Sequence, residues 1–421
     1  MTQTQPHIPI ALIGGGLTTQ VMALTLMHSG FDFVWFSGRP SGKPAEADTR
    51  TTTIHHAGKV MLETLGIWSA LPEPAYPITE IAVAGQRAET RHRKKDIRWP
   101  LRWQHDNPPM AYVVSNQALK TACEELIKTR LSAHQIRPVK IEQMQLSQPN
   151  MLQDSQQNLW PCDLVIGCDG ANSQLRTQAG LRAIDQSRQE TALVTTVTTE
   201  KPIGTTAYQR FLPSGPLALM PTAAKSASVV WSLPEAMATE LNQLDSAEFT
   251  AAITTAFGPD LGRLTQDTPC LSWPLKPTYC PQISTAGFVL AGDAAHALHP
   301  LAGMGFNLAL SDGAVLLDCL QAAAGAGLTP GHASVTTRYQ ARRKPEILAL
   351  TSATQGLNRL LTRPQDPLYQ LACVGMSVLG QLPARRLLSE LAMGGRLSSA
   401  PLFDGHLHAP ARQIRRRHRL S

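Results

Sequence analysis

The chain opens with a short apolar run, a glycine cluster and a helical pattern, in that order. Residues 9–13 are apolar, residues 14–16 are all glycine, and apolar positions recur at helical spacing from Val21 to Leu26. A second apolar run covers residues 31–36. Short apolar runs bounded by glycine are typical of buried strands. These features predict a strand, turn, helix and strand at the very start of the chain.

The apolar pattern changes twice further along the chain. Residues 78–103 and 191–273 contain shorter alternating runs separated by Pro and Gly, which predicts a mixed or antiparallel sheet in a second domain. Segments with nucleotide-binding character, at 160–180 and 285–320, lie on either side of it, so one domain is predicted to be inserted in the other. Residues 337–397 follow a helical pattern. We expect them to pack over the other domains, with contact to a membrane as the alternative.

Composition narrows the class of protein. The chain has 421 residues, of which 43% are hydrophobic and 16% charged, as in globular enzymes with a large core. The seven cysteines form no CxxC pair and no His/Cys cluster at metal-ligand spacing, so we expect a reducing compartment and no metal site. The N-terminus lacks the pattern of a signal peptide, and no uninterrupted apolar run is long enough to cross a bilayer. A cytoplasmic protein is expected.

Positive charge is concentrated at the C-terminal end. The net charge is +7, and five arginines lie between Arg412 and Arg419. Such a cluster favours anionic lipid head groups, although a solvated charged terminus is an equally good interpretation. Because no recognition fold or interleaved aromatic residues accompany it, we expect no nucleic-acid partner.

The glycine cluster is the first motif that carries chemistry. Glycines between a strand and a helix permit a tight turn, and the helix N-terminus offers free N–H groups to a phosphate. The segment departs from the usual GxGxxG pattern, because Thr19 replaces the third glycine. It departs again where Ser37 follows the second strand, at the position of the carboxylate that usually binds ribose. Alone, the motif is no more specific than an incidental glycine turn.

The second motif places an acid and a glycine at the end of an apolar strand. Residues 164–173 read Leu-Val-Ile-Gly-Cys-Asp-Gly-Ala-Asn-Ser, and Arg176 follows. Asp169 is positioned to meet a cofactor lying across the strand ends. An Asp-Gly turn that merely caps a buried strand is the alternative interpretation.

The third motif is the most specific. A strand from 287 ends in Gly292 and Asp293, where the carboxylate can accept hydrogen bonds from the hydroxyls of a ribityl chain. A glycine-rich loop with Gly303 and Gly305 then leads into an apolar helix. A helix N-terminus aimed at a ring stabilises negative charge on it, and glycines let the backbone lie against it. His296 and His299 in this loop are interpreted as structural rather than as bases.

The order and spacing of the three motifs resemble the class A flavoprotein monooxygenases, the group that contains p-hydroxybenzoate hydroxylase. Within that group the chain is most similar to the ubiquinone-biosynthesis hydroxylases over about residues 8–395. The further similarities lie in residues 48–50 with 65–68, in 113–119, and in 210–219 with 230–233.

The resemblance implies an α/β fold: a Rossmann-like FAD-binding domain with an inserted mixed-sheet substrate domain and a C-terminal helical segment. The expected ranges are 1–75, 104–185 and 275–335 for the FAD-binding domain, 76–103 and 186–274 for the substrate domain, 336–400 for the helical segment, and 401–421 for a basic tail.

It also implies a set of site residues. The residues expected to bind FAD are Gly14, Gly16, Ser37, Arg50, Asn116, Asp169, Gly292, Asp293, Gly303, Gly305 and Asn307. Those expected to face the flavin in a positional role are Pro300, Gly303, Gly305 and Phe306. Those expected to line the substrate pocket, where core packing explains each equally well, are Arg210, Phe211, Leu219 and Trp231. Met304 stands where the family loop usually has glutamine.

The implied reaction is hydroxylation of the aromatic ring of a lipophilic ubiquinone precursor through a flavin hydroperoxide. The expected co-substrates are dioxygen and NAD(P)H or another electron donor, and the cofactor supplies the chemistry. A polyprenyl phenol resides in a bilayer, so we expect peripheral contact with the inner face of the membrane through the arginine tail, and contacts with other ubiquinone-biosynthesis proteins. Three alternatives stay open: hydroxylation of a soluble aromatic compound, a flavin-dependent reductase, and a non-catalytic scaffold.

Overall fold

The structure is a computed structural model of the chain. It describes residues 3–38, 48–85, 99, 101–105, 107–362, 393–394 and 400–406.

The first large sheet has the strand order β20-β21-β11-β1-β2-β8, and β10 and β9 extend it from β11. Its strands are β1 (Ile8–Ile13), β2 (Val34–Phe36), β8 (Ile136–Arg137), β9 (Ile141–Gln145), β10 (Asn150–Asp154), β11 (Leu159–Gly167), β20 (Ser284–Thr285) and β21 (Phe288–Leu290). The pairs β1·β11, β1·β2 and β11·β21 are parallel. The carboxyl ends of these strands therefore meet at one edge of the sheet, where ligands bind in open α/β sheets.

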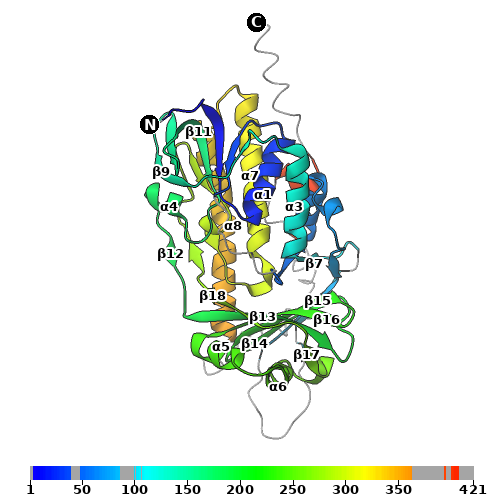
Figure 1. The fold of residues 1–421 in the computed structure, drawn as a ribbon. Coiled ribbons are helices and arrows are strands. Elements are labelled where there is room, and N and C mark those ends of the chain that lie inside the picture. The colour runs from blue at the N-terminus through cyan, green and yellow to red at the C-terminus, as the bar shows by residue number, and fades with distance from the viewer. Residues whose placement is uncertain are drawn as a thin grey trace.

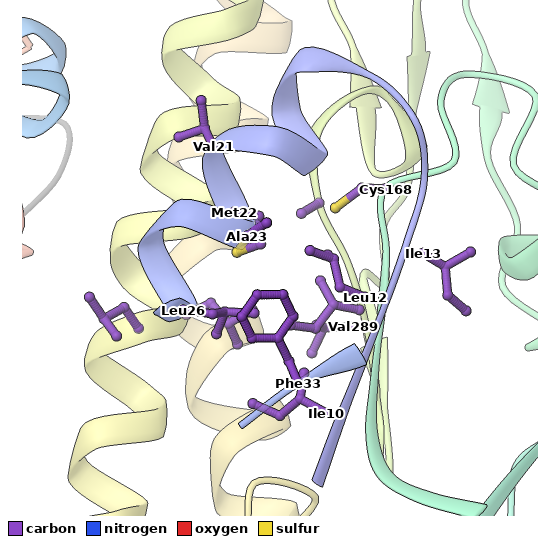
Figure 2. Close-up of a cluster of buried hydrophobic side chains, with 14 of the residues drawn as sticks. Ile10, Leu12, Ile13, Val21, Met22, Ala23, Leu26, Phe33, Cys168 and Val289 are labelled. Carbon is purple, nitrogen blue, oxygen red and sulfur yellow. The ribbon is translucent and has the colours of Figure 1, made fainter. Parts of the chain in front are cut away.

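Helices α1 (Leu17–His28), α3 (Asn116–Arg130), α7 (Gly305–Gly325) and α8 (Ala333–Leu361) cover this sheet. All residues of α1 from Thr19 to Leu26 are buried, as expected for a helix enclosed on every side. Figure 2 shows side chains of β1, α1 and β21, among them Leu12, Met22 and Val289, meeting between α1 and the sheet. This core fixes the turn between β1 and α1.

The second large sheet has the order β17-β13-β16-β15-β14-β5-β6, with β18 paired to β13. Its strands are β5 (Glu80–Gly85), β6 (Leu101–Gln104), β13 (Glu190–Thr199), β14 (Thr206–Leu212), β15 (Gly215–Ala223), β16 (Ser226–Pro234), β17 (Leu264–Gln266) and β18 (Leu271–Leu275). Most of its pairs are antiparallel, and β14·β5 is parallel. The mixed sheet predicted for the second domain is confirmed. Helices α5 (Glu235–Asn242) and α6 (Ser246–Phe257) cover the face away from the first sheet (Figure 1).

Two further sheets have three strands each. One has the order β3-β7-β4 and the other β12-β19-β22. Their strands are β3 (Thr51–His55), β4 (Tyr76–Ile78), β7 (Ala111–Ser115), β12 (Ile184–Asp185), β19 (Thr278–Tyr279) and β22 (His296–Ala297). The predicted substrate-domain piece 76–103 is thus divided, because β4 pairs with β7 whereas β5 and β6 join the second large sheet. The exact domain boundaries stay a prediction.

Helix α8 runs beside the first sheet and reaches the second (Figure 1). It contains Pro345 and is described to Leu361, so the predicted helical segment is confirmed over that part. The chain is described again at residues 393–394 and 400–406, where the amide of Ala57 donates to Met393 O at 3.1 Å. Leu402 and Phe403 are buried. Residues 401–404 therefore belong to the folded body and not, as predicted, to a tail, whereas the five arginines lie outside the described residues.

Helix α7 is long and apolar enough to cross a bilayer, but 72% of its most apolar stretch is buried within the fold. It packs against α1 and α8. The amino end of α7 forms part of the candidate site.

Candidate cofactor site and active site

The glycine turn has the geometry of a phosphate site. Gly14 has a φ of +148°, and a Cβ atom there would lie 2.3 Å from the carbonyl oxygen of Cys168. The indole Nε1 of Trp35 donates to Gly14 O at 2.8 Å and holds the turn. Gly16 is the N-cap of α1, without a side-chain cap, and nothing lies within 4 Å of the position of its Cβ. The start of this helix therefore borders open space and has no side-chain cap, as anion binding requires.

Thr19, in place of the third glycine, does not enter this space. Its side chain is fully buried, and its hydroxyl donates to Cys168 O at 3.4 Å. The departure from GxGxxG is therefore accommodated inside the contact between α1 and the sheet.

A cavity of about 400 Å³ opens beside the turn. It is lined by Ile13, Gly14, Gly15, Gly16, Phe36, Ser37, Gly38, Val139, Lys140, Ile141, Cys168, Asp169, Gly170, Asn172, Gln174 and Leu175. Ser37 lies at the end of β2, where a ribose is bound in folds of this type, and its hydroxyl donates to Gly38 O at 3.4 Å. The structure therefore brings Gly14, Gly16, Ser37 and Asp169 together. Lys140 was missed, because nothing in its sequence context marks it.

Asp169 is engaged by its own loop. Its carboxylate accepts hydrogen bonds from Ser173 Oγ at 2.5 Å and from the amide of Leu175 at 3.2 Å. Arg176 links this loop to the third motif, because its guanidinium donates to Ala171 O and to Ala294 O, each at 2.9 Å. The two motifs, far apart in sequence, form one wall.

The turn at Gly292 and Asp293 completes that wall. Gly292 has a φ of +61°, and a Cβ atom there would lie 2.9 Å from Thr18 Cγ2, so the turn packs on the first turn of α1. The Asp293 side chain is accessible to solvent. Desolvation by the surrounding protein raises the pKa of its carboxyl group, against the opposing effects of His296 and Arg50.

A second group of predicted residues gathers around Asp48. Arg50 Nε and Nη2 each donate to the Asp48 carboxylate at 2.7 Å, and the amide of Asn116 donates to Arg50 O at 3.0 Å. Interaction with Asp48 raises the pKa of Arg50, and Asp293 contributes in the same direction. The guanidinium also stacks at 4.4 Å on Trp273 of β18. Arg50 therefore lies close enough to Asp293 to interact with it electrostatically, and Asn116 lies beside Arg50. Trp273 was missed because it comes from a distant strand.

The loop before α7 is held against β3. Gly303 has a φ of +63°, and a Cβ atom there would lie 2.9 Å from Thr53 Cβ. Asn307 is buried; its Oδ1 accepts from the amide of His55 at 3.0 Å, and its Nδ2 donates to Thr53 O at 2.7 Å. With both ends of its side-chain amide engaged, Asn307 positions the loop, and its contact with the cofactor stays a prediction.

The amino end of α7 faces open space. Nothing lies within 4 Å of a Cβ position on Gly305, and Met304, the N-cap, provides no side-chain cap. Pro300 and Phe306 are half-buried beside it. This end of α7 can therefore accept a planar ring with developing negative charge.

Both loop histidines are buried. His296 Nε2 lies 2.7 Å from Asp312 Oδ2, and His299 Nε2 lies 3.3 Å from Glu190 Oε2. Burial raises the pKa of Glu190, whereas His299 together with Arg188 and Asn358 lowers it, and the net shift is downward. These contacts agree with the structural interpretation of both side chains.

Of the four predicted substrate-pocket residues, only Phe211 faces the loop. It packs in a buried cluster with Leu101, Leu301 and Leu361, which joins the second sheet to the loop and to α8. The prediction was wrong for the other three. Arg210 donates to Ala256 O and Phe257 O at the end of α6, and Leu219 and Trp231 are buried in the cluster beneath α5 and α6. Successive strand residues point to opposite faces, so Arg210 and Phe211 could not both face the pocket.

The described residues fit FAD. Gly16 and Asp293 follow the parallel strands β1 and β21 and therefore lie at the carboxyl edge of the first sheet. The amino end of α7 at Gly305, beside β3, is open as well and has no side-chain cap. Among the residues that the structure describes, no group of three or more His, Cys, Asp or Glu side chains is arranged to hold a metal ion.

Comparison with known proteins supports this fit. A family model described as an FAD binding domain matches residues 7–354. The ubiquinone hydroxylase UbiL of Rhodospirillum rubrum is 30% identical over 91% of this chain and 89% of its own length. The 3-demethoxyubiquinol 3-hydroxylase of Escherichia coli is 29% identical over 83% of this chain and 88% of its own.

Solved structures agree on the fold. The p-nitrophenol 4-monooxygenase PnpA of Pseudomonas putida superposes with a TM-score of 0.71 at 16% identity, covering 95% of this chain and 99% of that one. PqsL of Pseudomonas aeruginosa, a probable FAD-dependent monooxygenase, gives 0.68 at 18% identity, covering 88% and 99%. The predicted fold class and the FAD cofactor are confirmed. The chain belongs to the FAD-binding-domain family, among the FAD-dependent monooxygenases that include the ubiquinone hydroxylases.

Proposed function

We propose that this protein hydroxylates the aromatic ring of a lipophilic ubiquinone precursor, with FAD as cofactor and dioxygen as co-substrate. One observation carries the proposal: the buried apolar cluster of Phe211, Leu101, Leu301 and Leu361 lies against the loop that leads to the open amino end of α7. An apolar wall thus lies beside this loop, and we place the flavin ring next to it, at the amino end of α7. The names of the relatives, which are ubiquinone hydroxylases, support the same substrate class.

Bound FAD, reduced by NAD(P)H or another donor, supplies the chemistry that activates dioxygen. The chain's own residues bind and orient. The amino end of α1 at Gly16 would hold the pyrophosphate, Asp293 would accept hydrogen bonds from ribityl hydroxyls, and the amino end of α7 at Gly305 would stabilise negative charge on the ring.

The apolar cluster would exclude water from the reacting ring. Leu301 and Phe211 are packed inside this cluster and are each less than 10% exposed, so no solvent would reach a ring beside the loop from that side. Exclusion of water protects reactive species from side reactions.

A polyprenyl chain also implies contact with a bilayer. We propose that the arginines from Arg412 to Arg419 provide an electrostatic anchor on the inner face of the membrane, because clustered cations are attracted to anionic lipids. Co-sedimentation with anionic liposomes that is lost when these arginines are changed to Gln would support this. Equal sedimentation of both proteins would contradict it.

The substrate class is tested by comparing two phenols that differ only in a short prenyl chain. The protein is reconstituted with FAD and supplied with NAD(P)H, and consumption of dioxygen and formation of hydroxylated product are measured. We expect product from the prenylated phenol at a kcat/KM at least about tenfold higher, since burying even two CH₂ groups contributes more than 1.4 kcal/mol. Equal values would favour a soluble aromatic substrate. A folded protein that never retains flavin would favour a scaffold.

A further inference from the structure

Two helices share a buried ion pair behind the cofactor site. Asp312 of α7 and Arg343 of α8 both have side chains that are 0% exposed, and Arg343 Nε donates to Asp312 Oδ1 at 2.7 Å. Arg343 also pairs with Glu346 and donates to Leu308 O. None of these residues belongs to the three nucleotide-binding motifs, and none reaches the cavity beside Gly14.

The second oxygen of the same carboxylate holds the turn that carries Asp293. Asp312 Oδ2 accepts a hydrogen bond from the amide of Gly292 at 2.8 Å and lies 2.7 Å from His296 Nε2. Gly292 immediately precedes Asp293, and His296 follows three residues after it. One buried carboxylate therefore binds both ends of the segment 292–296.

Such an arrangement is costly unless it is fully satisfied. A buried carboxylate loses its hydration, and only several good donors offset that loss. Burial raises the pKa of Asp312, whereas His296, Arg343 and the amide of Gly292 together lower it, and the net shift is downward. The carboxylate is held from three sides, by Arg343, by the amide of Gly292 and by His296. Packing of two helices does not require a buried charge, and here the second carboxylate oxygen is used for two contacts with the turn 292–296.

We propose that Asp312 is a positioning residue for the cofactor: from inside the core it fixes the turn 292–296 so that Asp293 faces the ribityl chain, with Arg343 balancing its charge. The inference rests on FAD binding alone and not on the identity of the substrate. It also assigns His296 to this support, because its Nε2 is directed at Asp312 and its ring is fully buried.

The same two helices offer a matched control. Asp318 and Arg342 form another ion pair between α7 and α8, with side chains 30% and 24% exposed, and no hydrogen bond joins them to the turn 292–296. Asp312→Asn and Asp318→Asn therefore each remove one carboxylate charge from a pair between these helices. Only the first change alters the support of Asp293.

The test is the dissociation constant of FAD from each folded variant, with the melting temperature of the flavin-free protein measured in parallel. We expect Asp312→Asn to weaken FAD binding by about tenfold or more, as for the loss of a hydrogen bond to a charged group. Asp318→Asn should stay within about twofold of the parent. Equal affinities for FAD in the two variants, with a loss only of melting temperature in Asp312→Asn, would overturn the proposal.

A second pair of variants decides the case if Asp312→Asn does not fold. His296→Gln keeps an N–H that can reach Asp312, whereas His296→Leu does not. We expect His296→Gln to retain FAD affinity within about threefold and His296→Leu to lose about tenfold or more. If the two bind FAD equally well, the contact with Asp312 does not position the turn.

Discussion

The hydroxyl of Thr19 lies directly behind Gly14, where a Cβ atom on Gly14 would come within 2.5 Å of the Thr19 oxygen. The threonine that replaces the third glycine of the motif therefore occupies space that the first glycine leaves free. The two positions together keep α1 close to the sheet and leave the cavity side of the turn open.

From this relationship we predict that alanine at Gly14 lowers stability, whereas alanine at Gly16 lowers the affinity for FAD. Gly14→Ala should destabilise the protein by several kcal/mol, because its φ of +148° and its 2.3 Å approach to Cys168 O leave no room for a methyl group. Gly16→Ala meets no atom within 4 Å and should fold normally. It should nevertheless weaken FAD binding about tenfold or more, because the methyl group would occupy the path of the pyrophosphate.

Thermal melting of the flavin-free proteins and titration with FAD separate the two effects. If Gly16→Ala binds FAD as the parent does, the pyrophosphate does not lie on this turn.

The serine at the end of β2 leads to a second prediction. Ser37 lines the cavity without a carboxylate beside it, so a ribose there would receive only neutral hydrogen bonds. Ser37→Glu should tighten FAD binding up to about tenfold, because charge-assisted hydrogen bonds are roughly twice as strong. Ser37→Ala should weaken it by less than about tenfold. Fluorescence titration of FAD measures both, and weaker binding by the glutamate variant would place the ribose elsewhere.

His55 should make stability depend on pH. Burial lowers the pKa of His55 to about 4, from an ordinary value near 6.5. Its Nδ1 accepts the amide of Gly58 at 2.7 Å and caps α2. The unfolded chain therefore takes up the proton first, and the stability present above pH 6.5 is lost as the pH falls toward 4. Between pH 7 and pH 5 the free energy of unfolding should fall by about 2 kcal/mol from this group.

Urea unfolding of the parent and of His55→Asn checks this, because asparagine also caps helices but does not titrate. The variant should show a shallower dependence of stability on pH. An identical slope in both proteins would assign the effect to other groups.

The apolar cluster gives a fourth prediction, which separates the two faces of the second sheet. Phe211→Ala should lower kcat/KM for the prenylated phenol by about tenfold or more, because it opens the wall beside the loop at Leu301. Leu219→Ala removes a buried side chain from the opposite face and should cost about 3 kcal/mol of stability. Its kcat/KM per bound flavin should match the parent. Equal losses of kcat/KM in the two variants would contradict this placement of the pocket.

Much of the fold and of the cofactor site could be predicted from the sequence because local chemistry determines it. The strand, the glycines and the helix at 8–28 are contiguous, and so are Gly292, Asp293 and the start of α7. Their carboxyl-edge location follows from parallel pairing. The predicted residues Gly14, Gly16, Ser37 and Asp169 do line one cavity.

The remainder depends on contacts that no local pattern encodes. Trp273 meets Arg50 only through the packing of β18 near the first domain. In the sequence, Asp312 is one polar position in an apolar helix. Its role depends on an ion pair with Arg343, which belongs to another helix. The sequence predicted the strands that carry Arg210, Leu219 and Trp231, but not which face of the sheet each side chain is on. That is determined by helices α5 and α6, which cover the face with these three residues.

The most direct test of the central claim is the origin of the oxygen atom in the product. The FAD-reconstituted protein is incubated with a short-chain prenylated phenol and NAD(P)H under oxygen-18 gas, and the product is analysed by mass spectrometry. The account predicts one oxygen-18 atom on the ring, formed only when FAD is bound. Product oxygen that comes from water, or consumption of the reductant by the flavin-bound protein with no ring hydroxylation, would contradict it.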